Sequence, residues 1–230
     1  MPKHFKYTLP LLLSLLSHTS TYATVAIDET PWPSALNPTP RSFNNSPIDK
    51  RPIFVFAFVH DDIPESMISS IFPDHLIPAI KEVELTTGRR ISVQFIRSTP
   101  PYTTYDYKTT GQVAYDGWSL LAGNYRDIKN LPRNRATKFI LLTKDFIDGR
   151  MAGIAGVGQP FAIASLTNQQ VFGHELGHTL DAQHELAEVR FNGWACETYM
   201  VAVSSSLRSN CYVYTEPNRS RINAYLKGTP

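Results

Sequence analysis

The chain has 230 residues, of which 42% are hydrophobic and 18% are charged, and its formal net charge at pH 7 is +2. This length is sufficient for one domain with a substantial hydrophobic core after an N-terminal leader is removed. Because the charges are nearly balanced and neither sign forms a long run, nothing indicates a nucleic-acid partner, and we expect none.

The first 23 residues are predicted to form a secretory signal peptide. Two lysines precede a short apolar run at residues 9–16, and a polar stretch then ends at Ala23. This order of charged, apolar and small residues is typical of an export leader, cleaved here after Ala23 or alternatively after Ala26. No later segment reaches about 20 apolar residues, so we expect no stable membrane anchor and a secreted or periplasmic location.

Residues 24–51 are rich in proline, with serine, asparagine and threonine between the prolines. Such a composition favours an extended or mobile chain over packed regular structure. We interpret this segment as a linker or as a short inhibitory prosegment. The folded domain is predicted to span residues 52–230.

The first half of this domain alternates between predicted strands and helices. In chain order these are a strand at 53–59, a helix at 65–87, a strand at 90–97, a helix at 118–128 and a strand at 138–143. The first strand is apolar throughout, which indicates a central position in a sheet. Pro73 and Pro78 are expected to interrupt the first helix. This order predicts an α/β fold with a mainly parallel sheet. A further strand, at 162–165, is expected at the edge of that sheet.

The most informative motif reads H-E-x-x-H-x-x-x-x-x-H and runs from His174 to His184. His174 and His178 are four residues apart, so on a helix both project from one face and can bind one metal ion. Glu175 lies about 100° around the helix from His174, where it can act as a general base without being a ligand. His184 would complete a three-histidine site with one open position, which is the layout of a catalytic Zn²⁺ site.

The same helix is expected to bury its opposite face. Phe172, Leu176 and Leu180 lie together on the side away from the two histidines at 100° per residue. Thr167 and Gln170 have the spacing of a capping box, which predicts that the helix starts just upstream of the motif. One face of this helix should therefore pack in the core while the other lines a cleft.

These residues resemble the extended zinc signature of the metzincin metalloproteases, H-E-x-x-H-x-x-G-x-x-H. The run at 171–178 is most similar to the reprolysin (adamalysin) branch, where a cysteine and the methionine of a Met-turn follow, as Cys196 and Met200 do here. The resemblance covers about residues 52–227 and implies a metzincin-like zincin. Such a fold has a twisted, mostly parallel sheet, a zinc-binding active-site helix and a smaller C-terminal part containing the Met-turn.

The resemblance also implies how a substrate would bind. Met200 would be an apolar support beneath the zinc ligands, and residues 201–206 would form part of a pocket wall. A substrate peptide would lie along the edge strand that precedes the zinc helix, held by main-chain hydrogen bonds. The partner expected from this arrangement is a peptide or protein, while the oligomeric state stays open.

Asp181 stands where the family pattern has glycine. The backbone must turn sharply there to bring His184 back to the site, often with a positive φ angle. Aspartate tolerates the left-handed region better than most residues, so we interpret Asp181 as a turn residue. The alternative is that its carboxylate supports a ligand histidine through a hydrogen bond.

The chain has two cysteines, Cys196 and Cys211. In an oxidising compartment we expect them to form a disulfide, whose loop of about 16 residues would contribute roughly 3 kcal/mol to stability. Two free buried thiols are the alternative.

Together these features predict a secreted zinc-dependent endopeptidase. Residues 52–230 would be the catalytic domain, in which Glu175 acts as general base toward a water activated by the metal, and a peptide bond is hydrolysed. Two alternatives stay open: an inactive secreted scaffold that binds zinc, and a zinc amidase that acts on cell-wall peptides.

Overall fold

The computed structural model describes residues 50–191 and 193–227. The predicted signal peptide and residues 24–49 of the proline-rich segment lie outside these ranges. Among the described residues, no helix combines the length and apolar character needed to cross a membrane.

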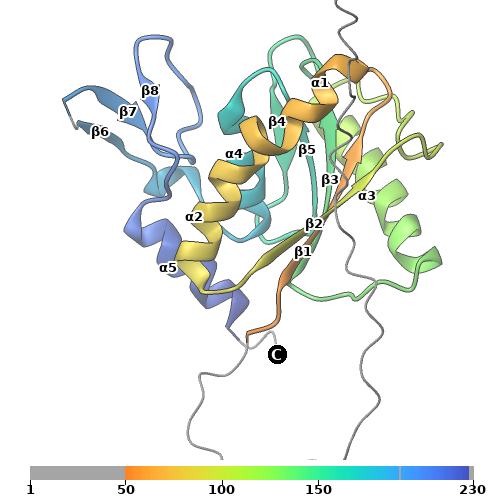
Figure 1. Ribbon diagram of the computed structural model, residues 1–230, viewed down its shortest axis with the longest axis horizontal. Coiled ribbons are helices and arrows are strands. Elements are labelled where there is room, and N and C mark those ends of the chain that lie inside the picture. Colours follow the sequence, from red (N-terminus) through yellow and green to blue (C-terminus); the bar gives the residue numbers. More distant parts are fainter. Residues whose placement is uncertain (1–49, 192, 228–230) are drawn as a thin grey trace, which may run out of the picture. The chain divides into compact units, whose positions relative to one another are not determined.

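The main element of the fold is a five-stranded sheet with a mostly parallel arrangement (Figure 1). In spatial order its strands are β2 (Ile91–Ile96), β1 (Ile53–Val59), β3 (Thr137–Thr143), β5 (Phe161–Ser165) and β4 (Gly153–Ala155). The first four of these are parallel to one another, whereas β4 pairs antiparallel with β5. The predicted α/β fold is therefore confirmed, and β1 lies inside the sheet, as its apolar sequence predicts.

The edge of the sheet differs from the prediction. β5, which contains residues 162–165, lies between β3 and β4, so the expected edge strand is an inner strand and that prediction is wrong. The edge strand on this side of the sheet is β4, and the chain turns back after Ala155 to pair with it through β5. Three residues are too few for an alternating pattern to be recognised in the sequence. A peptide that adds to this edge would therefore meet β4.

Four helices cover the sheet. They are α1 (Glu65–Ser70) with the π-helical segment η1 (Ile71–Leu76), α2 (Ile77–Thr87), α3 (Gly111–Ile128) and α4 (Gln169–Thr179). The segments α1, η1 and α2 follow one another without a gap, and the π-helical turn contains Pro73, where an interruption is predicted. α3 begins at Gly111, whereas the sequence pattern predicts a start at residue 118. The pattern misses the first two turns because they are too polar to show a clear apolar period.

The two faces of the sheet bury separate cores. Val55 and Ala57 of β1 contribute to the core beneath α2 and α4, whereas Phe56 and Phe58 point to the core beneath α3. This alternation is the two-residue period of a strand covered on both faces. Figure 1 shows α3 on one side of the sheet and α2 with α4 on the other.

The C-terminal part contains shorter elements. These are η2 (His184–Leu186), β6 (Val189–Phe191), β7 (Ala195–Glu197), β8 (Ser209–Asn210) and α5 (Glu216–Leu226). The three strands form a small sheet in the order β6-β7-β8. The predicted disulfide between Cys196 and Cys211 is present beside it. It therefore connects β7 to the chain just after β8.

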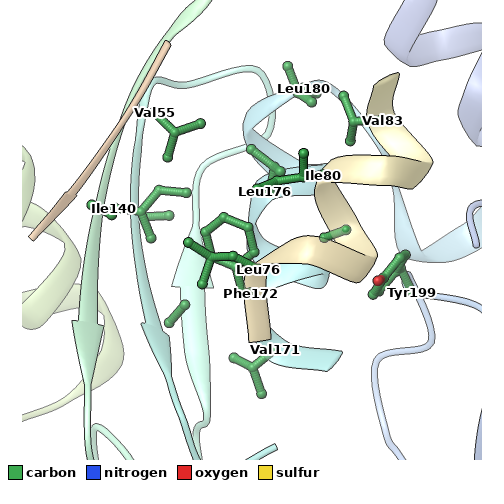
Figure 2. Packing of buried hydrophobic residues seen from close by; sticks show 14 of the residues in the cluster. Val55, Leu76, Ile80, Val83, Ile140, Val171, Phe172, Leu176, Leu180 and Tyr199 are labelled. Carbon is green, nitrogen blue, oxygen red and sulfur yellow. The ribbon is translucent and has the colours of Figure 1, made fainter. Parts of the chain in front are cut away.

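The apolar face of α4 packs as predicted. Phe172, Leu176 and Leu180 lie in one cluster with Leu76 and Ile80 (Figure 2). Leu176 and Leu180 are completely inaccessible to solvent. α4 is thereby packed between the sheet and α2.

A second side of α4, which carries Gly173 and Gly177 next to the apolar face, is also covered, and the sequence pattern does not predict this. The hydroxyl group of Tyr214 donates a hydrogen bond of 2.6 Å to the carbonyl oxygen of Gly173. A Cβ atom on Gly177 would lie 2.7 Å from Sδ of Met200 and 2.7 Å from Cε1 of Tyr214. Glycine at these helix positions therefore allows the C-terminal part to approach the helix backbone, and only the N-terminal half of α4 borders a cleft.

The start of α4 lies one residue later than the capping-box spacing suggests. The N-cap is Asn168, whose side-chain oxygen accepts a hydrogen bond of 2.8 Å from the backbone N–H of Gln170. The hydroxyl of Thr167 instead lies 2.7 Å from that of Ser165. Asparagine at the N-cap satisfies a backbone donor of the first turn, so the predicted role of Thr167 is wrong.

Candidate metal centre

The three histidines of the motif converge on one point. The Nε2 atom of His174 lies 3.2 Å from that of His178 and 2.9 Å from that of His184, and the Nε2 atoms of His178 and His184 are 2.8 Å apart. Two of these side chains come from successive turns of α4, and the third comes from η2. Their burial decreases from His178 to His174 to His184, so His184 lies on the open side of the cluster.

Backbone carbonyl groups orient two of the imidazole rings. Nδ1 of His174 lies 2.7 Å from the carbonyl oxygen of Tyr199, and Nδ1 of His178 lies 3.1 Å from that of Ala182. Because a carbonyl oxygen only accepts hydrogen bonds, each Nδ1 must carry the hydrogen. The Nε2 atoms of both rings are thereby left as bare acceptors that face each other, an arrangement that a cation between them stabilises.

The surroundings keep these rings neutral. Burial, followed by the neighbouring His178, lowers the pKa of His174 to about 3. Burial, followed by the neighbouring His184, lowers the pKa of His178 to about 4. Since a metal ligand must be the neutral imidazole, both side chains are in the ligating form at neutral pH.

A tight turn after α4 brings the third histidine back. Asp181 has φ = 75°, the left-handed conformation predicted for this position. The N–H of Ala182 donates to the carbonyl of Gly177 at 2.9 Å, which closes the helix end. The carboxylate of Asp181 binds Arg221 at 2.7 Å and not a histidine. The turn interpretation is therefore confirmed, and the alternative support of a ligand histidine by this carboxylate is not observed.

Glu175 lies beside the histidines as a buried carboxyl group. Only 4% of its surface is exposed, and burial raises its pKa well above the ordinary value. Its Oε2 atom has no hydrogen-bond partner among the described residues. A buried carboxyl group without a partner is unfavourable unless a cation or a donor lies nearby, which indicates that the site is built around one.

These observations test whether Zn²⁺ fits the site. A tetrahedral zinc ion with Zn–N distances of about 2.0 Å holds its ligand nitrogens about 3.3 Å apart. The separations of 2.8–3.2 Å between the three Nε2 atoms are close to this value. The neutral rings, the carbonyl partners of Nδ1 and the unpartnered Oε2 of Glu175 agree with it. The three histidines are therefore consistent with a bound zinc ion.

A cavity of about 600 Å³ opens onto this cluster. It is lined by Phe146, Arg150, Met151, Ala152, Gly153, Thr167, Asn168, Gln170, Val171, His174, Glu175, His184, Val201, Ala202, Val203 and Ser204. The segment at 201–204 forms one wall, as the resemblance implies for residues 201–206. The cavity therefore provides space for a ligand next to the candidate metal centre.

Met200 lies completely buried against α4, with its sulfur atom close to Gly177, the residue that directly precedes His178. The N–H of Val201 donates to the carbonyl of Thr198 at 3.1 Å, so the chain turns tightly around Met200. The same turn supplies the carbonyl of Tyr199 that orients His174. An apolar support beneath the histidines is compatible with this position.

Two features of the site have no signature in the sequence. The carbonyl groups that orient His174 and His178 belong to the backbone, which no residue type reveals. Lys138, the second residue of β3, is completely buried, and its ammonium group donates to the carbonyl of Thr179 at 2.5 Å and to the hydroxyl of Tyr225 at 3.2 Å. It thus holds the C-terminal end of α4, although the sequence shows only a polar residue in a strand.

Comparison with known proteins supports the fold. No protein-family model matches the chain, and no curated protein matches it in sequence. The structure is similar to the crystal structure of metalloproteinase-II from Bacteroides fragilis, with a TM-score of 0.52 and 15% sequence identity. The similarity covers 77% of this chain and 54% of that one, so this chain spans about half of its length. The protein therefore shares the fold of a metalloproteinase and carries a histidine cluster that can hold a metal ion.

Proposed function

We propose that the protein is an exported zinc-dependent endopeptidase of the metzincin type, closest to the reprolysin branch. The observation that carries this proposal is the convergence of three histidines beside a buried carboxyl group, Oε2 of which has no partner among the described residues, at a cavity of about 600 Å³. A structural zinc site would have four protein ligands, whereas three histidines leave a position open.

The disulfide supports export. Cys196 and Cys211 are paired, and structural disulfides persist in oxidising compartments outside the cytosol. This agrees with a signal peptide at residues 1–23 and with a secreted or periplasmic location.

The edge strand supports a peptide as the substrate. Ser165 donates its N–H to the carbonyl of Ala152 at 2.8 Å, so Ala152 and Ile154 direct their backbone groups toward β5. Gly153 and Ala155 then direct theirs to the outer side of the sheet. An extended peptide that pairs with them would pass Glu175 and the histidines, which lie next to this strand.

The chain's own residues have distinct roles in hydrolysis. His174, His178 and His184 would hold the zinc ion, and a bound zinc ion supplies Lewis-acid chemistry that polarises a carbonyl group and acidifies a water molecule. Glu175 takes the proton of the attacking water and passes it to the nitrogen of the leaving amine. The carbonyls of Tyr199 and Ala182 keep two of the histidines in the ligating tautomer.

The test is cleavage of a mixed peptide library by the purified chain lacking residues 1–23, with bound zinc measured in parallel. Glu175→Ala should retain about one zinc per chain and lose at least 100-fold in rate, since a positioned general base contributes 10²–10⁴-fold. Glu185→Ala, which removes an exposed carboxylate next to a ligand histidine, is the matched control and should stay active. Chelation should abolish cleavage, and added zinc should restore it.

The other outcomes distinguish the alternatives. Full zinc without cleavage by the wild type, before and after removal of residues 24–51, would indicate an inactive scaffold. Cleavage of cell-wall peptides alone would indicate an amidase. A chain that binds no zinc would refute the proposal.

A further inference from the structure

The first residue of the edge strand lies directly on the carboxyl group of Glu175. A Cβ atom on Gly153 would be 2.6 Å from Oε1, 2.7 Å from Cγ and 2.8 Å from Cδ of Glu175. Side-chain Cβ atoms do not approach other heavy atoms this closely, so one of the two residues would have to move. The φ angle of Gly153 is outside the left-handed region. The missing side chain of Gly153, and not its backbone freedom, therefore leaves room for the carboxyl group of Glu175 in its present position.

Because Oε2 of Glu175 is buried without a hydrogen bond among the described residues, packing has to define the direction of this carboxyl group. A glutamate side chain has three rotatable bonds, and Oε2 of Glu175 has no hydrogen-bond partner among the described residues. The backbone of α4 sets where the side chain begins, because the helix packs both on the sheet core and against Met200 and Tyr214 of the C-terminal part. The close contact with Gly153 then limits where the carboxyl group can lie.

We propose that Gly153 is a positioning residue that sets the conformation of Glu175 through steric contact. This inference rests on the proposed function, since it concerns the geometry of the general base. The backbone groups of Gly153 point to the outer side of the sheet, where a substrate strand would pair with them. The same residue therefore contacts both the substrate backbone and Glu175. Peptide and carboxyl group are thus placed relative to each other by one backbone segment.

The first experiment compares Gly153→Ala with Gly156→Ala. A Cβ atom on Gly156 would lie 2.5 Å from Oη of Tyr115 and 2.8 Å from Cγ of Gln159, so the control is equally crowded but does not contact Glu175. We expect Gly153→Ala to lower kcat about 10- to 100-fold, because a displacement of 1 Å can cost that much. KM should stay within about threefold, and zinc content should be unchanged. Equal kcat values for the two variants would overturn the proposal.

The second experiment measures the contact without any activity. In metal-free protein, Gly153→Ala should lower the melting temperature by about 3–10 °C, as expected for overpacking in a domain of this size. In a Glu175→Ala background, the freed space accommodates the added methyl group, and the decrease should be at most half as large. If Gly153→Ala alone does not fold, the double variant should still do so.

The two experiments separate the possible failures. Equal decreases in both backgrounds, or a double variant that fails to fold as well, would overturn the positioning role of Gly153. A wild-type chain that binds zinc but cleaves no peptide would instead overturn the proposed function, whatever the melting temperatures show.

Discussion

Lys138 provides a test of how burial acts on a charged group at the C-terminal end of α4. Its ammonium group is bound only by neutral oxygen atoms, those of Thr179 and Tyr225, and no carboxylate of the described residues lies within ion-pair distance. Burial, followed by the charge of Arg135, lowers the pKa of Lys138 from 10.5 to about 7. Replacement by methionine removes the titrating group while it keeps most of the side-chain volume.

The sign and size of the effect follow from proton linkage. Between pH 7 and 10.5 the unfolded chain holds the lysine proton and the folded chain does not, so unfolding takes up a proton and the free energy of unfolding rises with pH. The slope is about 1.4 kcal/mol per pH unit. Between pH 7 and pH 9.5, wild type should therefore gain about 3 kcal/mol relative to Lys138→Met.

The assay is urea denaturation of both proteins at several values between pH 6 and pH 9.5, without reductant and with zinc removed. Lys144→Met, in which an exposed lysine is removed, sets the baseline for the loss of one lysine. Because the histidines titrate in every variant, their contribution cancels in the difference. A difference between wild type and Lys138→Met that does not change with pH would show that this reasoning about burial is incorrect.

Two further predictions concern the packing of α4 and the disulfide. Gly177→Ala should destabilise the protein by about 1–3 kcal/mol despite the better helix propensity of alanine, because its Cβ would contact Met200 at 2.7 Å. Gly123→Ala in α3, where the nearest atom would be 3.8 Å away, should instead stabilise the protein by roughly 0.5–1 kcal/mol. Thermal unfolding of the wild type and of both variants measures these changes. If both substitutions shift stability in the same direction, close approach is not the reason for the glycine at 177. Replacing Cys196 and Cys211 by serine should cost about 3 kcal/mol in urea denaturation, the value for a loop closed across 15 residues, and an unchanged midpoint would contradict it.

The sequence by itself was informative wherever a local pattern recurs along the chain. The uninterrupted apolar run of β1 predicts its inner position in the sheet, and the four-residue spacing of His174 and His178 predicts a shared helix face. The turn at Asp181 follows from the need to return His184 to those two residues. These inferences succeed because they depend on the geometry of one strand, one helix or one turn.

Features that depend on contacts between distant segments are visible only in the folded chain. β4 is too short to show a period, so only its pairing with β5 reveals it as the edge strand. The carbonyl of Tyr199 and the backbone of Gly153 act on His174 and Glu175 through groups that every residue possesses. In the sequence, Lys138 is a polar residue in a strand, and only the folded chain shows that its Nζ atom binds the carbonyl group of Thr179 at the end of α4. The sequence therefore determined which side chains can hold a metal ion. The packing of the chain determined which backbone atoms orient them.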